Sequence, residues 1–181
     1  MAVALPTGIR NYVRDKLLEV RLLFTREPNQ MTDFFKQIND LNKLLIIVPR
    51  DRAEEVSVRK YVTQIRQIFK GTRIATLDVF NIRDHDVNWI GLPNQHYIKK
   101  LYDEKYELVI DLNSHHDYLC AYLCFCTRAP LRLHLVSGKY DKIYNLQLRV
   151  GEFASVDTKF RNLINYLARM RGIETDEKVT A

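Results

Sequence analysis

The sequence predicts an α/β fold, a Rossmann-like three-layer sandwich with a mostly parallel sheet of about five strands. Two observations predict it. Short apolar runs, typical of strands covered on both faces, alternate along the chain with segments whose apolar residues recur at helical spacing. The clearest run, residues 43–49, is followed by an amphipathic helix and then by a second run at 73–79, which is the spacing of a βαβ unit. With 181 residues, 46% of them hydrophobic, the chain suits one domain with its own core.

The remaining elements follow the same alternation. Further strands are expected at residues 106–112, 131–136 and 144–150, the last of them at an edge of the sheet. The segment 118–125 is apolar all round, which predicts a largely buried helix. The three cysteines of the chain are clustered in this segment and directly after it, and are interpreted as small core residues in a reducing compartment: Cys120, Cys124 and Cys126. A closing helix carries an apolar face of Phe160, Leu163, Ile164, Leu167 and Met170.

An amphipathic helix is expected before the first strand, from about residue 6 to residue 24. Its apolar face comprises Ile9, Tyr12, Val13, Leu17, Val20 and Phe24. We expect this helix to pack against its own domain. Two alternatives stay open, namely that the basic helix lies on an anionic membrane or forms a homodimer. The expected organisation is a helical segment at 1–40, a Rossmann-like domain at 41–172 and a disordered tail at 173–181.

The composition gives a net charge of +6, from 28 basic and 22 acidic residues. The favoured interpretation is a solvated basic surface, while nucleic acid, an anionic membrane or an anionic sugar remain as partners. Nucleic-acid binding would gain support if six cations shared one exposed face: Arg50, Arg52, Arg59, Lys60, Arg66 and Lys70. No signal-peptide pattern is recognised, so we expect a cytoplasmic protein, with peripheral attachment at the inner membrane left open.

Ligands of open α/β sheets bind beyond the carboxyl ends of the strands, near a switch in strand order. This rule points to the loops after Val48, Val79, Leu112 and Val136, of which 111–117 is the richest in polar residues. Ser114 and Asp117 are candidates to cap the next helix. The candidate ligand-binding residues are Arg50, Asp111, Asn113, Ser114, His115 and Ser137.

Other chemistries have little support in the sequence. Adjacent His115 and His116 point apart in regular structure and no His-x3-His pair exists, so no metal site is expected. Neither a G-x-G-x-x-G motif nor a Walker A loop is present, and no cofactor is expected. Residues 84–86 are interpreted as a solvated loop. Trp89 is either a sugar-stacking platform or, more commonly for a lone tryptophan, a core or loop anchor.

Two motifs carry a resemblance to a known family. Residues 107–113 read ELVIDLN, an apolar helix follows, and residues 129–133 read APLRL. This pattern is similar to the acceptor-side half of heptosyltransferase-type glycosyltransferases (family nine), and the resemblance extends over residues 44–150. The segments 88–93 and 144–149 resemble a short, single-domain bacterial form of that family.

The resemblance implies a function and a candidate base. The family's enzymes pair an acceptor half with a half that binds an ADP-sugar, and the second half has no counterpart here. In the enzymes a Gly-Asp loop after the first strand supplies the base; here that position reads VPRDR, which makes Asp51 the candidate, with helix N-capping as its favoured role. We therefore expect a non-autonomous or non-catalytic binding module for a glycolipid precursor or a protein partner. The alternatives are the acceptor subunit of a split glycosyltransferase and a basic nucleic-acid-binding domain.

Overall fold

The computed structural model describes residues 7–23, 34–49, 55–136, 143–148 and 154–173. Within these ranges the chain forms one sheet with the order β2-β1-β3-β4-β5, and every strand pairing is parallel. The strands are β1 (Lys43–Ile47), β2 (Arg73–Leu77), β3 (Leu108–Asp111), β4 (Leu131–His134) and the two-residue edge strand β5 (Leu146–Gln147). The predicted α/β class and the mostly parallel sheet are confirmed, with four strands of ordinary length and a minimal fifth.

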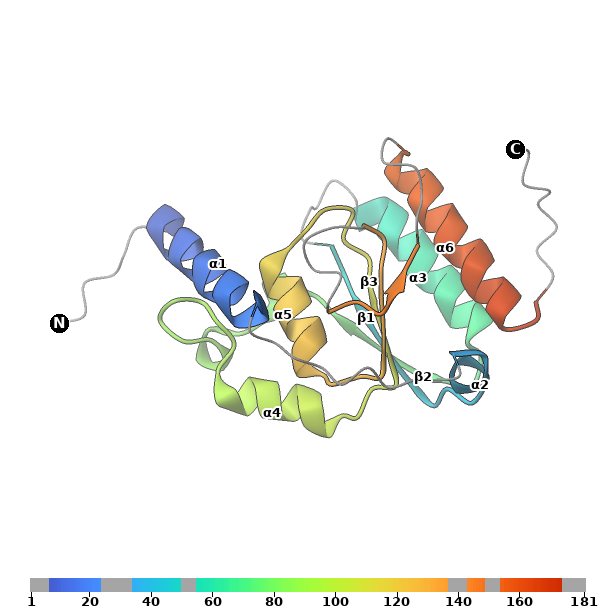
Figure 1. Ribbon diagram of the computed structural model, residues 1–181, viewed down its shortest axis with the longest axis horizontal. Coiled ribbons are helices and arrows are strands. Elements are labelled where there is room, and N and C mark those ends of the chain that lie inside the picture. The colour runs from blue at the N-terminus through green and yellow to red at the C-terminus, as the bar shows by residue number, and fades with distance from the viewer. Residues whose placement is uncertain (1–6, 24–33, 50–54, 137–142, 149–153, 174–181) are drawn as a thin grey trace.

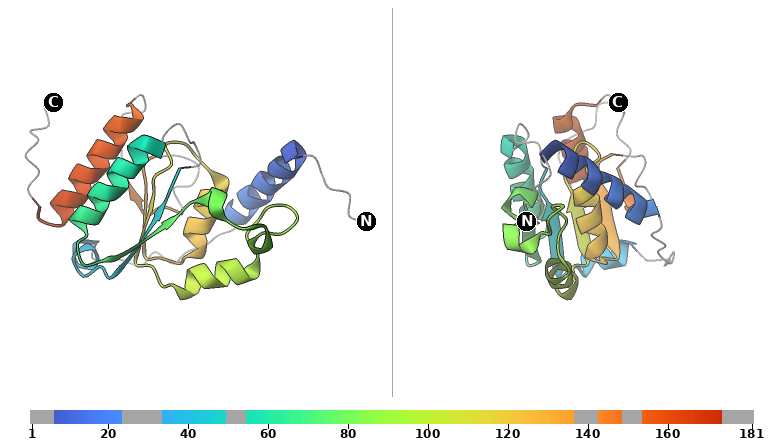
Figure 2. Two further views of the ribbon diagram at one scale, coloured as in Figure 1. Left: turned by 180° about the vertical axis from the view of Figure 1, so that it is seen from behind. Right: turned by 90° about the vertical axis from the view of Figure 1, so that its left-hand side faces the viewer.

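Helices cover both faces of this sheet and make three layers (Figures 1 and 2). They are α1 (Thr7–Leu23), α2 (Phe34–Asn39), α3 (Glu55–Ile68), α4 (Gln95–Asp103), α5 (Tyr118–Cys126) and α6 (Val156–Met170). The 3-10 helices η2 (Val79–Asn81) and η3 (Asp84–Asp86) follow β2. The sheet separates α2, α3 and α6 from α1, α4 and α5. None of the described helices is long and apolar enough to cross a membrane.

Successive side chains of each strand point to opposite faces of the sheet, and this divides the core in two. In β1, Leu44 and Ile46 pack with α3 and α6, while Leu45 and Ile47 pack with α5. All four side chains are at most 2% exposed, as expected for a central strand covered on both faces. The continuous apolar run that predicted β1 is thus explained by two separate hydrophobic layers.

Short polar residues start the helices around the sheet. Asn94, Asp117 and Ser155 each accept a hydrogen bond from a backbone N–H in the first turn of α4, α5 and α6 respectively. The predicted cap by Asp117 is confirmed, whereas Ser114 lies three residues earlier in the loop and is not the N-cap of α5. Gly71 ends the α3 segment with a φ of +89°, a backbone conformation that residues with a Cβ seldom adopt.

The strand order places a switch point between β1 and β3. From β1 the chain moves outward to β2, then returns to the other side of β1 and continues through β3, β4 and β5. This is the doubly wound 2-1-3-4-5 order, in which ligands bind at the carboxyl edge near the switch. The carboxyl ends of all five strands meet at that edge because the pairing is parallel throughout.

The orientation of α1 differs from the prediction. α1 packs on α5 through the side that carries Leu18, which is fully buried, and Arg14, which is 7% exposed. The predicted core face points outward instead, with Tyr12 66% exposed and Val20 50% exposed. The helix therefore packs on its own domain as predicted, but through a different face, because helical periodicity identifies an apolar face without identifying what covers it.

A polar contact joins α3 to α6 and predicts a pH effect on stability. The Tyr61 hydroxyl donates to the Asp157 carboxylate at 2.5 Å, and this bond, followed by Arg161, lowers the pKa of Asp157. A carboxyl pKa lower in the folded state contributes stability above the unfolded-state pKa, and this contribution is lost as the pH falls through the folded value. Tyr61→Phe should therefore melt a few degrees below the wild type at pH 7, and the difference should shrink at pH 3.

Thermal melts of both proteins at the two pH values test this, with Arg161→Gln as the control for the second partner of Asp157. The Tyr61 pKa is raised to about 12, first by burial and then by Asp157. The tyrosine thus stays protonated over the whole range of the experiment. A difference in melting temperature that is equal at pH 3 and pH 7 would contradict the assignment.

Candidate functional site

A row of aligned residues marks the carboxyl edge of the sheet. The row consists of Leu77, Ile47, Asp111, His134 and Gln147, one from each strand in spatial order. Asp111 and His134 pair directly across β3 and β4, and both are at most 2% exposed. Because side chains alternate and Val109 packs in the α5 layer, Asp111 and His134 face α5 as well.

Asp111 is the centre of a buried hydrogen-bond network. Its Oδ1 accepts from the backbone N–H of Asn113 at 3.0 Å and from the Asn113 side chain at 2.6 Å. Its Oδ2 accepts from the Tyr144 hydroxyl at 2.5 Å. Burial, reinforced by the negative charge of Asp111, raises the pKa of Tyr144 far above its ordinary value. The carboxylate thus ties the loop after β3 to the segment before β5, and its oxygens are engaged within the fold.

His134 completes this cluster. Its ring stacks on Tyr144 with centroids 4.4 Å apart, and its Nδ1 lies 2.8 Å from the Val136 carbonyl. Because a carbonyl only accepts, Nδ1 carries the proton of the neutral ring and Nε2 is left as an acceptor. This Nε2 is buried without a hydrogen-bond partner in the described part of the chain. The exposed His116 ring lies above it, at 5.8 Å between centroids.

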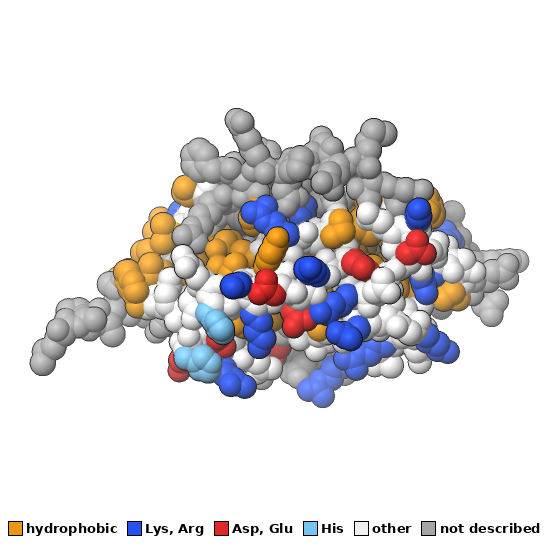
Figure 3. Space-filling model, turned by 90° about the horizontal axis from the view of Figure 1, so that it is seen from below, with side chains coloured by type: hydrophobic (Ala, Val, Ile, Leu, Met, Phe, Trp, Pro, Cys, Tyr) orange, Lys and Arg blue, Asp and Glu red, His pale blue; other side chains and the backbone are white. Residues whose placement is uncertain are grey.

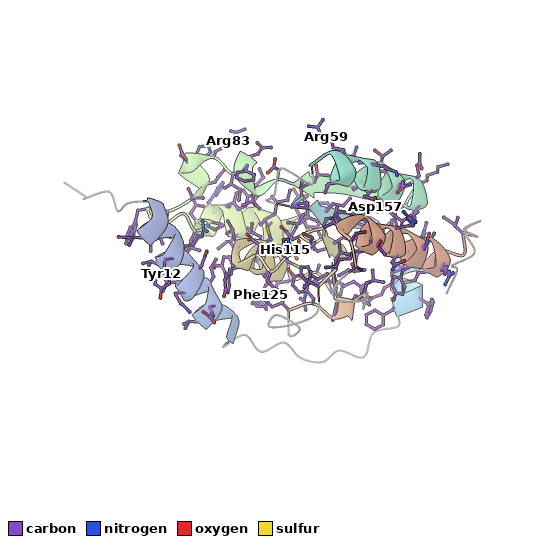
Figure 4. The ribbon with its side chains drawn as sticks, turned by 90° about the horizontal axis from the view of Figure 1, so that it is seen from above. Tyr12, Arg59, Arg83, His115, Phe125 and Asp157 are labelled. Carbon is purple, nitrogen blue, oxygen red and sulfur yellow. The ribbon has the colours of Figure 1, made fainter. Side chains whose placement is uncertain are left out.

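The structure brings some of the predicted site residues together. Asp111 and Asn113 are directly hydrogen bonded, and Ser114 is buried beside them with 4% exposure. His115 is exposed near the middle of the carboxyl edge (Figure 4). The other predicted positions, Arg50, Asp51 and Ser137, lie outside the described residues.

A groove occupies the same edge on the opposite face of the sheet. Its cavity volume is about 410 Å³. Its lining comes from the ends of β1 and β2, from η2 and from one side of α3: Val48, Pro49, Val58, Arg59, Val62, Thr63, Arg66, Thr76, Asp78, Phe80 and Asn81. Figure 4 shows Arg59 on α3, at the margin of the edge and well apart from His115. The groove and the Asp111 cluster are therefore separate features, with the sheet between them.

The electrostatics of this groove favour anions. Arg59 and Arg66 are seven residues apart on α3, which places them on one side of the helix two turns apart. No carboxylate in the described ranges pairs with Arg66. Asp78, the acidic residue of the lining, is occupied by hydrogen bonds from the Phe80 N–H and the Asn81 side chain. Val58, Val62 and Phe80 add apolar surface, so the groove fits a ligand with both an anionic and a nonpolar part.

The loops of this groove could be predicted from the sequence, but its helix could not. The loop after Val48 was predicted, while Arg59 and Arg66 were considered only as members of a nucleic-acid face. The signal was present in the spacing of Arg59, Thr63 and Arg66, at i, i+4 and i+7, opposite the buried Tyr61 and Ile65. It could be interpreted only once the neighbouring strand was known.

Other candidate residues have simpler roles. Cys120, Cys124 and Cys126 form no disulfide and are buried, which confirms their interpretation as core residues. Burial raises the pKa of the Cys120 thiol, and the thiolate is disfavoured. Trp89 is 70% exposed, so the core-anchor interpretation is wrong. Over the described ranges, no three His, Cys, Asp or Glu side chains are arranged to hold a metal ion.

Comparisons with known proteins give one match. No curated protein and no solved structure is significantly similar to the chain. The model of a family of unknown function, DUF6913, matches residues 21–170, from the last three residues of α1 to the end of α6. The match covers both faces of the sheet, the groove and the Asp111 cluster. The chain therefore belongs to the DUF6913 family.

Proposed function

We propose that this chain is a binding module that holds a phosphorylated saccharide, the polar head of a glycolipid precursor, in the groove at the carboxyl ends of β1 and β2. The observation that carries the proposal is that two arginines, Arg59 and Arg66, line the same cavity of about 410 Å³. Arginine binds phosphate through charge and through two parallel N–H donors, which makes it suited to this headgroup.

The rest of the lining suits the remainder of such a ligand. Thr63, Thr76 and Asn81 supply groups that can donate to or accept from sugar hydroxyls. Phe80 is 49% exposed and offers an aromatic face to the C–H groups of a sugar ring. The acceptor-side resemblance of residues 44–150 supports the same class of ligand, since that half of the glycosyltransferases holds a lipid-linked sugar.

The proposed role is binding without autonomous transfer. Glycosyl transfer requires donor and acceptor to be held together in a cleft from which water is excluded. A single Rossmann-like sheet offers one wall of such a cleft. If the chain takes part in transfer, it does so as the acceptor subunit of a split enzyme whose donor half is another polypeptide.

The test is isothermal titration with a phosphorylated lipid-A-type disaccharide and with the same disaccharide after removal of its phosphates. We expect the phosphorylated ligand to bind and the dephosphorylated one to bind at least about tenfold more weakly, because charged hydrogen bonds contribute about 1.5–3 kcal/mol each. Arg59→Glu and Arg66→Glu should each weaken binding of the phosphorylated ligand by about tenfold or more.

Arg169→Glu is the matched control, since Arg169 is exposed on α6 and does not line the groove. Equal losses in all three variants would show a nonspecific effect of net charge and contradict the proposal. Binding of short single-stranded DNA in preference to the disaccharide, with a steep dependence on salt, would favour the nucleic-acid alternative. Binding of an ADP-sugar would reopen an enzymatic role for the isolated chain.

A further inference from the structure

An apolar surface lies at the end of the molecule that carries α1. Its helical part is the outward face of α1, where Ile9 is 51%, Tyr12 66%, Leu17 41% and Val20 50% exposed. Figure 4 shows Tyr12 on the side of α1 that faces away from the body of the domain. Hydrophobic side chains gather at this end in the space-filling view (Figure 3). Large apolar side chains concentrated on one exposed face indicate an interaction surface.

The loop between η3 and α4 extends at the same end of the molecule, as the ribbon diagrams show (Figures 1 and 2). It carries Trp89, which is 70% exposed. Tryptophan and tyrosine combine an apolar body with a polar tip, and both concentrate where lipid headgroups meet acyl chains. The end surface therefore presents two aromatic residues of this kind beside the aliphatic side chains of α1.

The charges on α1 limit which partner can cover this face. At 100° per residue, Lys16 falls near the middle of the arc formed by the exposed apolar residues, and its side chain is 58% exposed. Lys16 pairs with Glu19 at 2.8 Å, on the flank of the same helix. In a contact between two copies, the Lys16 ammonium group would be removed from water against apolar side chains, which is costly. On a membrane, its long stem lets the ammonium group reach the phosphates of the headgroups.

The size of the face also favours a membrane over a second copy of the chain. A helix of 17 residues is about 25 Å long and presents a strip about 10 Å wide, or about 250 Å². A stable contact between proteins buries about 800 Å² on each partner. An amphipathic helix of this length is, in contrast, sufficient for attachment to a bilayer, and the net charge of +6 adds attraction to anionic lipids.

We propose that the outward face of α1, together with Trp89, docks this protein onto an anionic lipid bilayer. The helix lies in the plane of the interface with Ile9, Tyr12 and Val20 directed into the lipid. Lys16 stays at the level of the phosphates. The proposal does not depend on the ligand of the groove, because that groove lies on the opposite face of the sheet.

The experiment is cosedimentation of the full chain with vesicles of phosphatidylcholine and phosphatidylglycerol, compared with vesicles of phosphatidylcholine alone. The wild type should sediment with the anionic vesicles and should be released as the salt concentration rises. Tyr12→Asp and Val20→Asp should each reduce the partition coefficient by about tenfold or more, because a charge replaces an inserted apolar side chain. Trp89→Ser should give a smaller loss of the same sign.

Phe35→Asp is the matched control. Phe35 is 65% exposed on α2, at the other end of the molecule, and its replacement should leave partitioning unchanged. Circular dichroism melts of all variants check that they fold, as expected for exposed positions. Failure of the wild type to bind anionic vesicles at low salt would overturn the proposal, as would an equal loss in Phe35→Asp. A dimer in solution that dissociates in Tyr12→Asp would also overturn it, by showing that a second copy covers the face.

Discussion

Asp111→Ala is expected to lower the free energy of unfolding by about 3–4 kcal/mol. The substitution removes the acceptor of three hydrogen bonds, two from Asn113 and one from Tyr144. The Tyr144 hydroxyl lies in a side chain that is only 3% exposed, so it cannot recover the bond from bulk water. Each buried donor left without a partner costs about 1–3 kcal/mol. Removing the carboxylate also removes the cost of keeping a charge away from water, which offsets part of this loss of stability. Urea denaturation measures the difference.

Two further variants show that the network is the cause. Asp111→Asn keeps one carbonyl oxygen as an acceptor for Asn113, and its amide can donate to the Tyr144 oxygen, so the loss should be less than half as large. Asp103→Ala removes an exposed carboxylate on α4 and should change the stability by less than about 0.5 kcal/mol. An Asp111→Ala protein within about 1 kcal/mol of the wild type would mean that water satisfies the cluster and that the cluster is accessible to a ligand.

The fold was predictable because its signals are local. A continuous apolar run followed by Pro49 is typical of a buried parallel strand, and the structure has β1 at Lys43–Ile47. The apolar helix at 118–125 is explained in the same way, because α5 is enclosed by the sheet, α1 and α4. β5 is shorter than predicted, because Tyr144 and Asn145 before it and Leu148 after it are not part of the strand.

The Asp111 cluster was predictable only in part. Asp111 and Asn113 are adjacent in sequence, and the rule for carboxyl edges identified them. Tyr144 reaches Asp111 from 33 residues away, and His134 joins it through the register of β3 and β4. No pattern within either segment indicates that contact. Long-range pairing has to be known before such partners can be named.

Arg132 illustrates the same limit. It reads as an interruption of an apolar strand, yet it is only 4% exposed in the structure. Its guanidinium donates to the carbonyls of Ile143 and Ala129. The charge is stabilised by backbone carbonyls that strand pairing leaves unused, so Arg132 fastens the segment before β5 to β4. Periodicity alone would have placed this residue on a solvated face.

Phe160→Ala is expected to produce the other large effect, a loss of about 3–5 kcal/mol in the free energy of unfolding. Phe160 is fully buried between α6 and α3, and its ring stacks on Tyr61 with centroids 4.8 Å apart. Truncation removes the transfer free energy of the ring and leaves a cavity beneath α6 that a close-packed core fills only in part. For a chain of this size, each kcal/mol corresponds to about 2–4 °C in melting temperature, so thermal melts should resolve the change easily.

Phe35→Ala is the control for Phe160→Ala, because it removes the same side chain from an exposed position and should cost less than about 0.5 kcal/mol. Phe160→Leu should lose less than half as much as Phe160→Ala, since it keeps most of the apolar volume. If Phe160→Ala costs no more than Phe35→Ala, α6 is not part of the cooperative core. The layer formed by α3 and α6 would then contribute little to stability, and the groove along α3 would have to be held by the sheet alone.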